Sequence, residues 1–331
     1  MTRLLARYAE SIFWLARYME RAENLARILE VQEAFARDSK GSHDWGMILK
    51  INADRVRFRA SQKEATAAAV LHFYVTDRGN HTTLVSNVFH ARENARALRP
   101  LISTEMWVQL NIFYNRVAAL GPADLGELRL TRLCGMIKEG CDAHAGITAG
   151  TFYRDEAWSF YQLGAAIECA DQTTRLLDAK FLGLKERHDI QAGSAADISY
   201  WTVLLRSAAG YQAFRRRNQR GMRPDDVASF MICDSSFPRS VACNIGIIVD
   251  ELTRLRRLFR LKAAAGALGR LDALIASLDI VNVRNALAQD GLHQFIDNVQ
   301  RSLADLTDYL AQGFFGHAPT TPEPGMRQSQ G

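Results

Sequence analysis

The chain has 331 residues, of which 48% are hydrophobic and 23% are charged, and its formal net charge at pH 7 is +5. This composition is that of an ordinary globular protein, and a chain of this length buries enough surface to fold without a metal ion or a disulfide. The positive charge is mild, and its clusters at residues 215–223 and 254–262 are spread around helices. Solvated or ion-paired faces are therefore favoured over a nucleic-acid surface.

Apolar residues recur at helical spacing along almost the whole chain, and no window shows sustained strand alternation. The seven prolines either fall where helical patterns begin or end or lie close to residue 331. Helices are predicted near residues 3–38, 44–52, 61–76, 83–98, 103–119, 124–148, 155–183, 195–219, 224–233, 239–263, 266–287 and 290–313. A turn at 77–80 is followed by a predicted N-cap at Thr83, and Asp155 is predicted to cap the helix after it. The predicted fold is all-α, a multi-helix bundle.

One charged segment occurs twice, with the copies 148 residues apart. The first copy is Glu20-Arg21-Ala22-Glu23-Asn24-Leu25-Ala26-Arg27, and the second is Glu168-Cys169-Ala170-Asp171-Gln172-Thr173-Thr174-Arg175. In both copies the acids and the last arginine border the apolar stripe of an amphipathic helix, where an unpaired charge is costly. The repetition predicts an internal duplication, with halves at 1–150 and 151–313 that share one core, followed by a disordered tail at 314–331.

A third segment, Ala91–Arg99, partly repeats the first copy and places three arginines on one helical face. Glu20 and Glu23 stand three residues apart and repel each other, so they need a cation from outside their helix, from Arg92, from Arg96 or from a ligand. The candidate polar cluster, whether binding or structural, comprises Glu20, Arg21, Glu23, Asn24, Arg27, Arg92, Glu93, Asn94, Arg96, Glu168, Asp171 and Arg175. Two i,i+4 pairs have the acid first, which is the favourable order for an ion pair within a helix: Glu23 with Arg27, and Asp171 with Arg175. The structural interpretation of the cluster is therefore favoured.

These motifs resemble the alpha-E family, a bacterial all-helical domain named for its fold and its Glu-Arg motif. The resemblance runs from about residue 3 to residue 313. It rests on Tyr8–Asn24, Ala91–Arg96, Ser103–Trp107, Asp155–Trp158, Tyr200–Trp201 with Leu205–Ala208, and Phe237–Val241. Family members usually carry Gly-Arg-Tyr and Glu-Arg in the second copy, whereas this chain has Gly164-Ala165-Ala166 and Glu168-Cys169, and Asn80-His81 replaces the usual Asn-Pro. With two arginines missing, either the second site is degraded or neighbouring arginines compensate.

The sequence contains no pattern that predicts a metal or a cofactor. Five cysteines without Cys-x-x-Cys spacing favour reduced thiols in a cytoplasmic protein and argue against zinc. A ferritin-like di-metal site needs Glu-x-x-His on two helices, and Asp290-x-x-His293 is a single loose variant of it. No phosphate loop, nucleophile elbow or Ser-His-Asp order occurs. Neither a signal peptide nor a membrane span is expected.

Two functions remain open. The resemblance implies a gene encoded beside, or fused to, a circularly permuted ATP-grasp ligase and often a transglutaminase-like peptidase. The first hypothesis is therefore a non-catalytic helical partner of an ATP-grasp peptide ligase system, which binds the ligase, its peptide or both. The alternative is an enzyme that uses Glu20 or Glu23 as a general base and Arg21 or Arg92 to hold a phosphorylated or carboxylate substrate. The first is preferred because no nucleophile accompanies either copy.

Overall fold

A computed structural model of the chain describes residues 4–38, 44–62, 64–185, 194–219 and 221–318. These residues form helices and no strand, which confirms the predicted all-α fold. The α-helices are α1 (Ala6–Asp38), α2 (Gly46–Ile51), α3 (Arg55–Ser61), α4 (Ala67–Val75), α5 (Leu84–Ala97), α6 (Thr104–Ala118), α7 (Glu127–Thr151), α8 (Glu156–Lys185), α9 (Ala195–Ser207), α10 (Tyr211–Arg217), α11 (Pro224–Cys233), α12 (Val241–Arg257), α13 (Ala263–Ser277), α14 (Ile280–Ala288) and α15 (Leu292–Leu310). A 3-10 turn η1 (Pro122–Leu125) precedes α7, and a π-helical turn η2 (Ala311–Phe315) follows α15.

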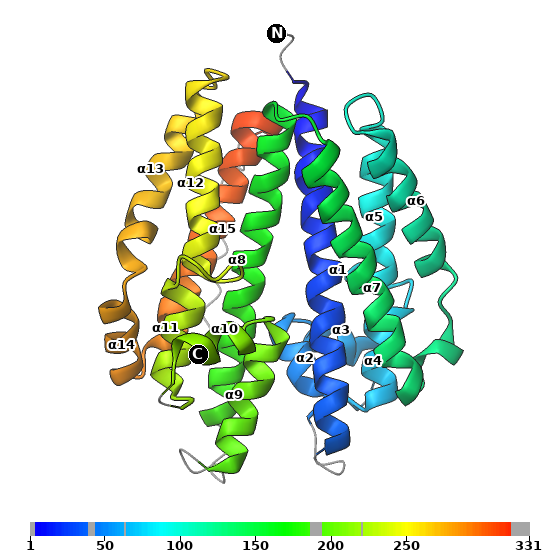
Figure 1. The fold of residues 1–331 in the computed structure, drawn as a ribbon, viewed down its shortest axis with the longest axis vertical. Helices are drawn as coiled ribbons and strands as arrows, with labels where there is room; N and C mark the ends of the chain where they lie inside the picture. Colours follow the sequence, from blue (N-terminus) through cyan, green and yellow to red (C-terminus); the bar gives the residue numbers. More distant parts are fainter. Residues whose placement is uncertain (1–3, 39–43, 63, 186–193, 220, 319–331) are drawn as a thin grey trace.

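The two long helices α1 and α8 lie side by side at the centre of the molecule (Figure 1). They run in the same direction, since Leu4 contacts Glu156 at one end and Arg17 contacts Glu168 farther along. On one side α1 packs with α5 and α7, and α6 closes this group; on the other side α8 packs with α12 and α15, and α13 closes the second group. The contact between α1 and α8 therefore joins the two groups, which form the two halves of the bundle.

The helices that follow α1 and α8 in these two groups begin in the same way. Thr83 caps α5 by accepting a hydrogen bond from the Ser86 amide, and Ser240 caps α12 by accepting one from the Cys243 amide. Four residues after each cap, Asn87 and Asn244 donate to the carbonyl of their capping residue, at 2.9 and 2.7 Å. The shared pattern is what a duplication would leave behind, and the duplication itself stays a prediction.

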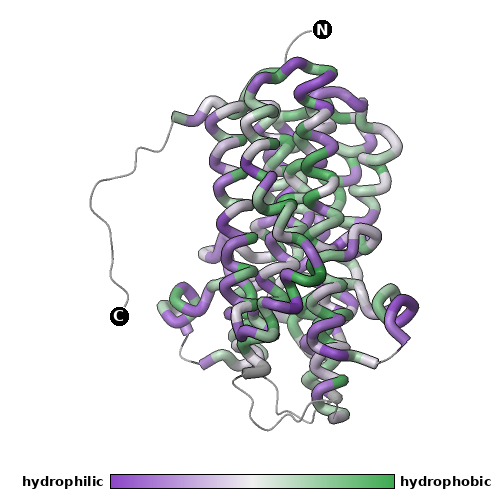
Figure 2. Tube along the Cα trace, turned by 90° about the vertical axis from the view of Figure 1, so that its left-hand side faces the viewer, coloured by the Kyte–Doolittle hydropathy of each residue, from purple (hydrophilic) through white to green (hydrophobic). Residues whose placement is uncertain are grey.

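Buried apolar side chains form one continuous core across both halves. Hydrophobic and hydrophilic residues alternate within single turns of the long helices (Figure 2), as expected where each helix buries one face. At the α1–α8 contact the helices approach closely where α8 carries Gly164. A Cβ atom at that position would lie 2.2 Å from the Phe13 carbonyl oxygen. The absence of a side chain there sets the spacing of the central pair.

Several predicted boundaries were wrong because single residues interrupt the helices. The predicted helix at 195–219 is two helices, because Ala209 adopts a left-handed conformation (φ 55°) and the Gly210 amide turns back to the Leu205 carbonyl at 2.7 Å. This is the C-terminal signal of a helix. The predicted helix at 239–263 ends earlier, at Arg257, and Arg260 follows with φ 56°.

Two further predicted segments are divided. The pattern at 266–287 breaks at Leu278, and Asp279 starts α14 as its N-cap by accepting from the Val281 amide at 2.6 Å. The pattern at 61–76 contains only α4, which Thr66 caps, and α3 precedes it without having been predicted. Short helices such as α3 have too few turns for their periodicity to stand out. The predicted caps at Thr83 and Asp155 are confirmed.

The predicted disordered tail begins too early at 314. Phe314 and Phe315 pack against Phe160, at centroid distances of 5.2 and 5.9 Å, and Phe315 also packs against Phe13 at 5.3 Å. These rings close the end of the core between α1 and α8. The remainder of the predicted tail, from 319 to 331, lies outside the described residues.

We predict that Gly164→Ala destabilises the fold by ~1–3 kcal/mol, because the new methyl group meets backbone rather than a movable side chain. Gly246→Ala, in α12, is the matched control: it has open space around the new Cβ atom and should stabilise its helix by up to ~1 kcal/mol. Urea unfolding of both variants measures the difference. Equal effects of the two substitutions would show that α1 and α8 are not in close contact.

Candidate functional site

The centre of the α1–α8 interface holds a fully buried carboxylate, Glu168 (side chain 0% exposed). Nε of Arg17 donates to its Oε2 at 2.7 Å, Nε of Arg21 donates to its Oε1 at 2.6 Å, and Gln172 donates to Oε1 at 3.0 Å. Burial alone would raise the pKa of Glu168, but the two guanidinium groups outweigh it and lower the pKa to about 2. Glu168 is therefore ionised and ion-paired at neutral pH.

Aromatic rings on α1 hold these two arginines in place. Trp14 and Tyr18 share a helical face with Arg17 and Arg21, because their positions are three or four residues apart. The guanidinium of Arg17 lies 4.9 Å from the ring centre of Trp14, and that of Arg21 lies 5.7 Å from it and 5.9 Å from the ring centre of Tyr18. Such cation–π contacts fix long side chains that would otherwise rotate. Arg17 was outside the predicted cluster, although it lies within the Tyr8–Asn24 motif.

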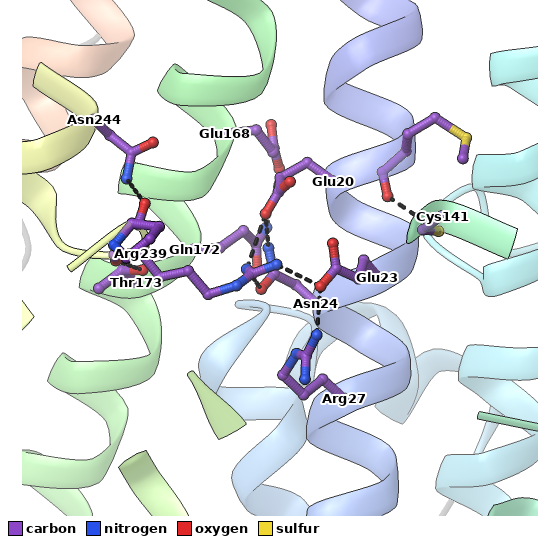
Figure 3. Close-up of polar contacts among 12 residues, drawn as sticks. Glu20, Glu23, Asn24, Arg27, Cys141, Glu168, Gln172, Thr173, Arg239 and Asn244 are labelled. Atoms are coloured by element: carbon purple, nitrogen blue, oxygen red, sulfur yellow. Dashed lines mark hydrogen bonds and ion pairs between the residues drawn. The ribbon is translucent and has the colours of Figure 1, made fainter. Parts of the chain in front are cut away.

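The acids of the first copy receive their cation from Arg239, just before α12. Figure 3 shows its guanidinium extending from the α8 side to the acids on α1. Nη1 donates to Glu20 Oε1 at 2.9 Å and to Asn24 Oδ1 at 2.6 Å, and Nη2 donates to Glu23 Oε1 at 2.6 Å. Arg27 donates to the same Glu23 oxygen at 2.5 Å. Arg239 thus forms ion pairs with both Glu20 and Glu23.

The backbone position of Arg239 is fixed independently of its side chain. Thr173 of α8 donates its hydroxyl to the Arg239 carbonyl at 2.8 Å, and Asn244 donates to the Pro238 carbonyl at 2.9 Å (Figure 3). The sequence carried a signal for this residue, because Arg239 lies in the Phe237–Val241 motif between a proline and the N-cap Ser240. It was nevertheless missed, since no periodic pattern places it near Glu20.

Glu20 and Glu23 differ in charge environment although they share Arg239. Burial raises the pKa of Glu20, and the charges of Glu23 and Glu168 raise it further against the attraction of Arg239. Burial also acts on Glu23, but there Arg239 and Arg27 together lower the pKa. Glu20 is therefore the less well neutralised of the two acids.

The remaining residues of the predicted cluster form separate pairs. Asp171 and Arg175 pair within α8 at 2.7 Å. Arg92 on α5 pairs with its neighbour Glu93 at 2.7 Å and donates to Asn111 of α6 at 2.9 Å, and Arg96 pairs with Glu93 at 2.6 Å. Asn94 donates to the His90 carbonyl at 3.0 Å.

The expectation that Arg92 or Arg96 supplies the cation for Glu20 and Glu23 was wrong. The face of α5 that packs on α1 carries Ala91 and Ala95, which turns Arg92 toward α6 and its ring Tyr114. The acids on α1 instead face α8 and the residues before α12. The enzyme hypothesis asked Arg21 or Arg92 to hold a substrate beside these acids, but Arg21 is bound to Glu168 and Arg92 lies on another side of α1.

The buried thiols and the buried histidine are held neutral. Burial raises the pKa of Cys134 to about 12 and raises those of Cys141 and Cys169 as well. Burial lowers the pKa of His144 to about 4. These thiols are protonated at neutral pH, which is the unreactive form. In the part of the chain that the structure describes, no group of three or more His, Cys, Asp or Glu side chains is arranged to hold a metal ion.

The fold and this network define a class of protein: an all-helical bundle whose central helices are joined by buried glutamate–arginine pairs. A sequence comparison matches residues 4–315 to the Alpha-E family, described as a predicted alpha-helical domain with a conserved ER motif, and the chain belongs to this family. Comparisons with curated proteins and with solved structures gave no match. Among the described helices, none combines the length and the apolar character needed to cross a bilayer.

We predict that Arg239→Met destabilises the protein by about 3 kcal/mol, because it leaves two largely buried carboxylates without their shared cation. Arg96→Met is the control: it removes a largely exposed partner of Glu93, which keeps its pair with Arg92, and should cost less than ~1 kcal/mol. Chemical denaturation at pH 7 compares them. A loss below ~1 kcal/mol for Arg239→Met would contradict a buried network.

A second prediction concerns pH. Because the pKa of Glu168 lies below its ordinary value of 4.5, its stabilising contribution is present above pH 4.5 and is lost as the pH falls toward 2. Glu168→Gln should therefore cost ~3–5 kcal/mol at pH 7, and this deficit should shrink steadily between pH 5 and pH 3. Unfolding free energies measured across that range give the result.

The control for the pH experiment is Glu139→Gln, at an exposed position of α7, which should change stability by less than ~0.5 kcal/mol at pH 7. A deficit of Glu168→Gln that stays constant from pH 7 to pH 3 would mean that the glutamate is not ionised in the folded protein.

Proposed function

We propose that this protein is a non-catalytic helical partner of an ATP-grasp peptide ligase system, and that it binds the ligase through the groove between α6 and α7. The choice of an ATP-grasp ligase as the partner rests on the resemblance to the alpha-E family, which implies a gene encoded beside, or fused to, such an enzyme. The charged network supports a non-catalytic role. Its arginines Arg17, Arg21 and Arg239 bind carboxylates of the protein itself, and the enzyme hypothesis needs an arginine that holds a substrate.

The observation that carries the proposal is an apolar groove of about 520 Å³ between α6 and α7. Its α6 wall includes Val108 and Ile112, two residues that are 46% and 50% exposed. Phe113, Met136 and Ile147 form further apolar lining. Two large aliphatic side chains one helical turn apart, both open to solvent beside a groove, are typical of a surface that a partner covers.

The shape and charge of the groove favour one occupant, an amphipathic helix of the ligase. The α6 lining extends from Thr104 to Arg116, about 18 Å along the helix axis, which matches roughly three turns of a docked helix. An amphipathic helix presents apolar residues at every third or fourth position to such a groove. The charged lining residues are two acids, Glu105 and Glu139, and one base, Arg116, and this acidic excess favours a helix with basic residues beside its apolar stripe.

The test is to measure binding and activity of the ATP-grasp ligase from the same genome with and without the full-length protein. The protein alone should hydrolyse no ATP, and its addition should change ligase activity or substrate choice. Val108→Asp and Ile112→Asp should weaken ligase binding at least tenfold, because each places a charge in an apolar contact. Isothermal titration calorimetry gives the affinities, and a coupled assay gives ligase turnover.

Ile275→Asp is the matched control, since Ile275 lies on α13, outside the groove, and is 44% exposed. It should leave ligase binding unchanged. The proposal fails if the ligase neither binds the protein nor responds to it, or if the Val108 and Ile112 variants bind as tightly as Ile275→Asp.

A further inference from the structure

The two copies of the charged segment differ in the side chains around their glutamates. Glu168 of α8 is faced by residues of α1, and Glu20 of α1 is faced by residues of α8. Arg17 and Arg21 of α1 bind the Glu168 carboxylate, and the rings of Trp14 and Tyr18 lie against their guanidinium groups. The residues 148 positions farther along the chain are Gln162, Ala165, Ala166 and Cys169 of α8. Each is smaller than its counterpart, and none carries a positive charge.

These four smaller residues line a cavity of about 200 Å³ that also includes Glu20. The remaining lining comes from Pro238, Arg239, Asn244 and Ile247. The cavity is therefore lined by the α8 residues that correspond to the two arginines bound to Glu168 and to the two rings packed against those arginines. Ala165 is half-buried and Ile247 is exposed, so this end of the cavity adjoins solvent.

Glu20 lacks part of the neutralisation that Glu168 has. Glu168 receives two arginines of its own, whereas Glu20 shares Arg239 with Glu23. Among the described residues, Glu20 accepts hydrogen bonds only from Arg239 and Asn24, and both use Oε1. Its Oε2 therefore accepts none from the described chain. The raised pKa of Glu20 agrees with a carboxylate that lacks a cation.

The cavity has a second acceptor that suits a hydrogen-bond donor. The side-chain nitrogen of Asn244 donates to the carbonyls of Pro238 and Ser240, and its amide also lies within hydrogen-bond reach of the Cys169 thiol. The amide oxygen has two lone pairs and can accept a further donor. A planar cation with several N–H groups can bind a carboxylate and an amide oxygen at once. The volume is below the roughly 300–1,000 Å³ of pockets that hold drug-sized ligands, so the group that enters is a head group.

We propose that the cavity over Glu20 binds the guanidinium or amidinium head of a small organic cation, which takes the place that Arg17 and Arg21 occupy over Glu168. The head group pairs with Glu20 Oε2, and its apolar stem lies along Pro238 and Ile247. Two sources share this chemistry, a free guanidino compound and the arginine side chain of a peptide. This inference does not depend on the α6–α7 groove or on the ligase.

The test uses the full-length protein at low ionic strength with three probes: agmatine, the peptide acetyl-Gly-Arg-Gly-amide, and methylurea, a neutral compound of similar head-group shape. Calorimetry or ligand-detected NMR gives the dissociation constants. Agmatine should bind saturably with one site per chain, and methylurea should not bind. Saturable binding of the peptide as well would assign the site to arginine side chains; binding of agmatine alone would assign it to free guanidino compounds.

Three variants test the location. Cys169→Arg and Ala165→Arg each place a guanidinium in the cavity and should weaken agmatine binding at least tenfold, and Ala165 is exposed enough to accept a long side chain without unfolding. Cys233→Arg makes the same change on α11, outside the cavity, and should leave the dissociation constant within twofold. The inference is overturned if agmatine does not bind the wild-type protein, if methylurea binds as well as agmatine, or if Cys233→Arg weakens binding as much as the cavity variants.

Discussion

The ion pairs of Arg17 and Arg21 with Glu168 require α1 and α8 to lie at one distance and in one register. A carboxylate without solvent contact is stable as an ion only if its partners stay within hydrogen-bond reach, and both partners here lie on the neighbouring helix. Gly164 allows the required approach, and Arg239 ties the residues before α12 to the same pair through Glu20 and Glu23. The outer helices pack on a central pair whose geometry these contacts determine.

The sequence predicted the helices well where they are long and amphipathic, because such a helix repeats its apolar spacing over many turns. The long central helices and the caps at Thr83 and Asp155 were recognisable for this reason. The interruptions between helices could not be recognised in this way. The left-handed residue Ala209 looks like any helix-forming alanine, and at Gly210 beside it the nearby Phe237 ring leaves no room for a Cβ atom. Tertiary packing of this kind leaves no periodic trace.

The candidate site was predicted in part. The repeated acids and Arg21 were found because they recur at equal spacing in two helices, and their position beside the buried stripe follows from helical geometry. Their partners were not predictable in the same way. Glu168 pairs across the interface, and Arg239 reaches Glu20 from 219 residues away, whereas the nearer and better patterned Arg92 turns toward α6. A single sequence shows which charges need partners but not which distant element supplies them.

The pairing of α1 with α8 has a consequence for how the chain folds. Helix α1 is near the start of the chain, but its polar groups meet their partners 147, 151 and 219 residues later. Contacts of such high sequence separation form slowly, because a long loop must close before they are gained. During synthesis, α1 emerges with Arg17, Arg21 and Glu20 unpaired beside an apolar stripe, and it stays so until α8 and the segment before α12 have left the ribosome. The polar contacts of the central pair are therefore expected to form late, after most of the chain has been made.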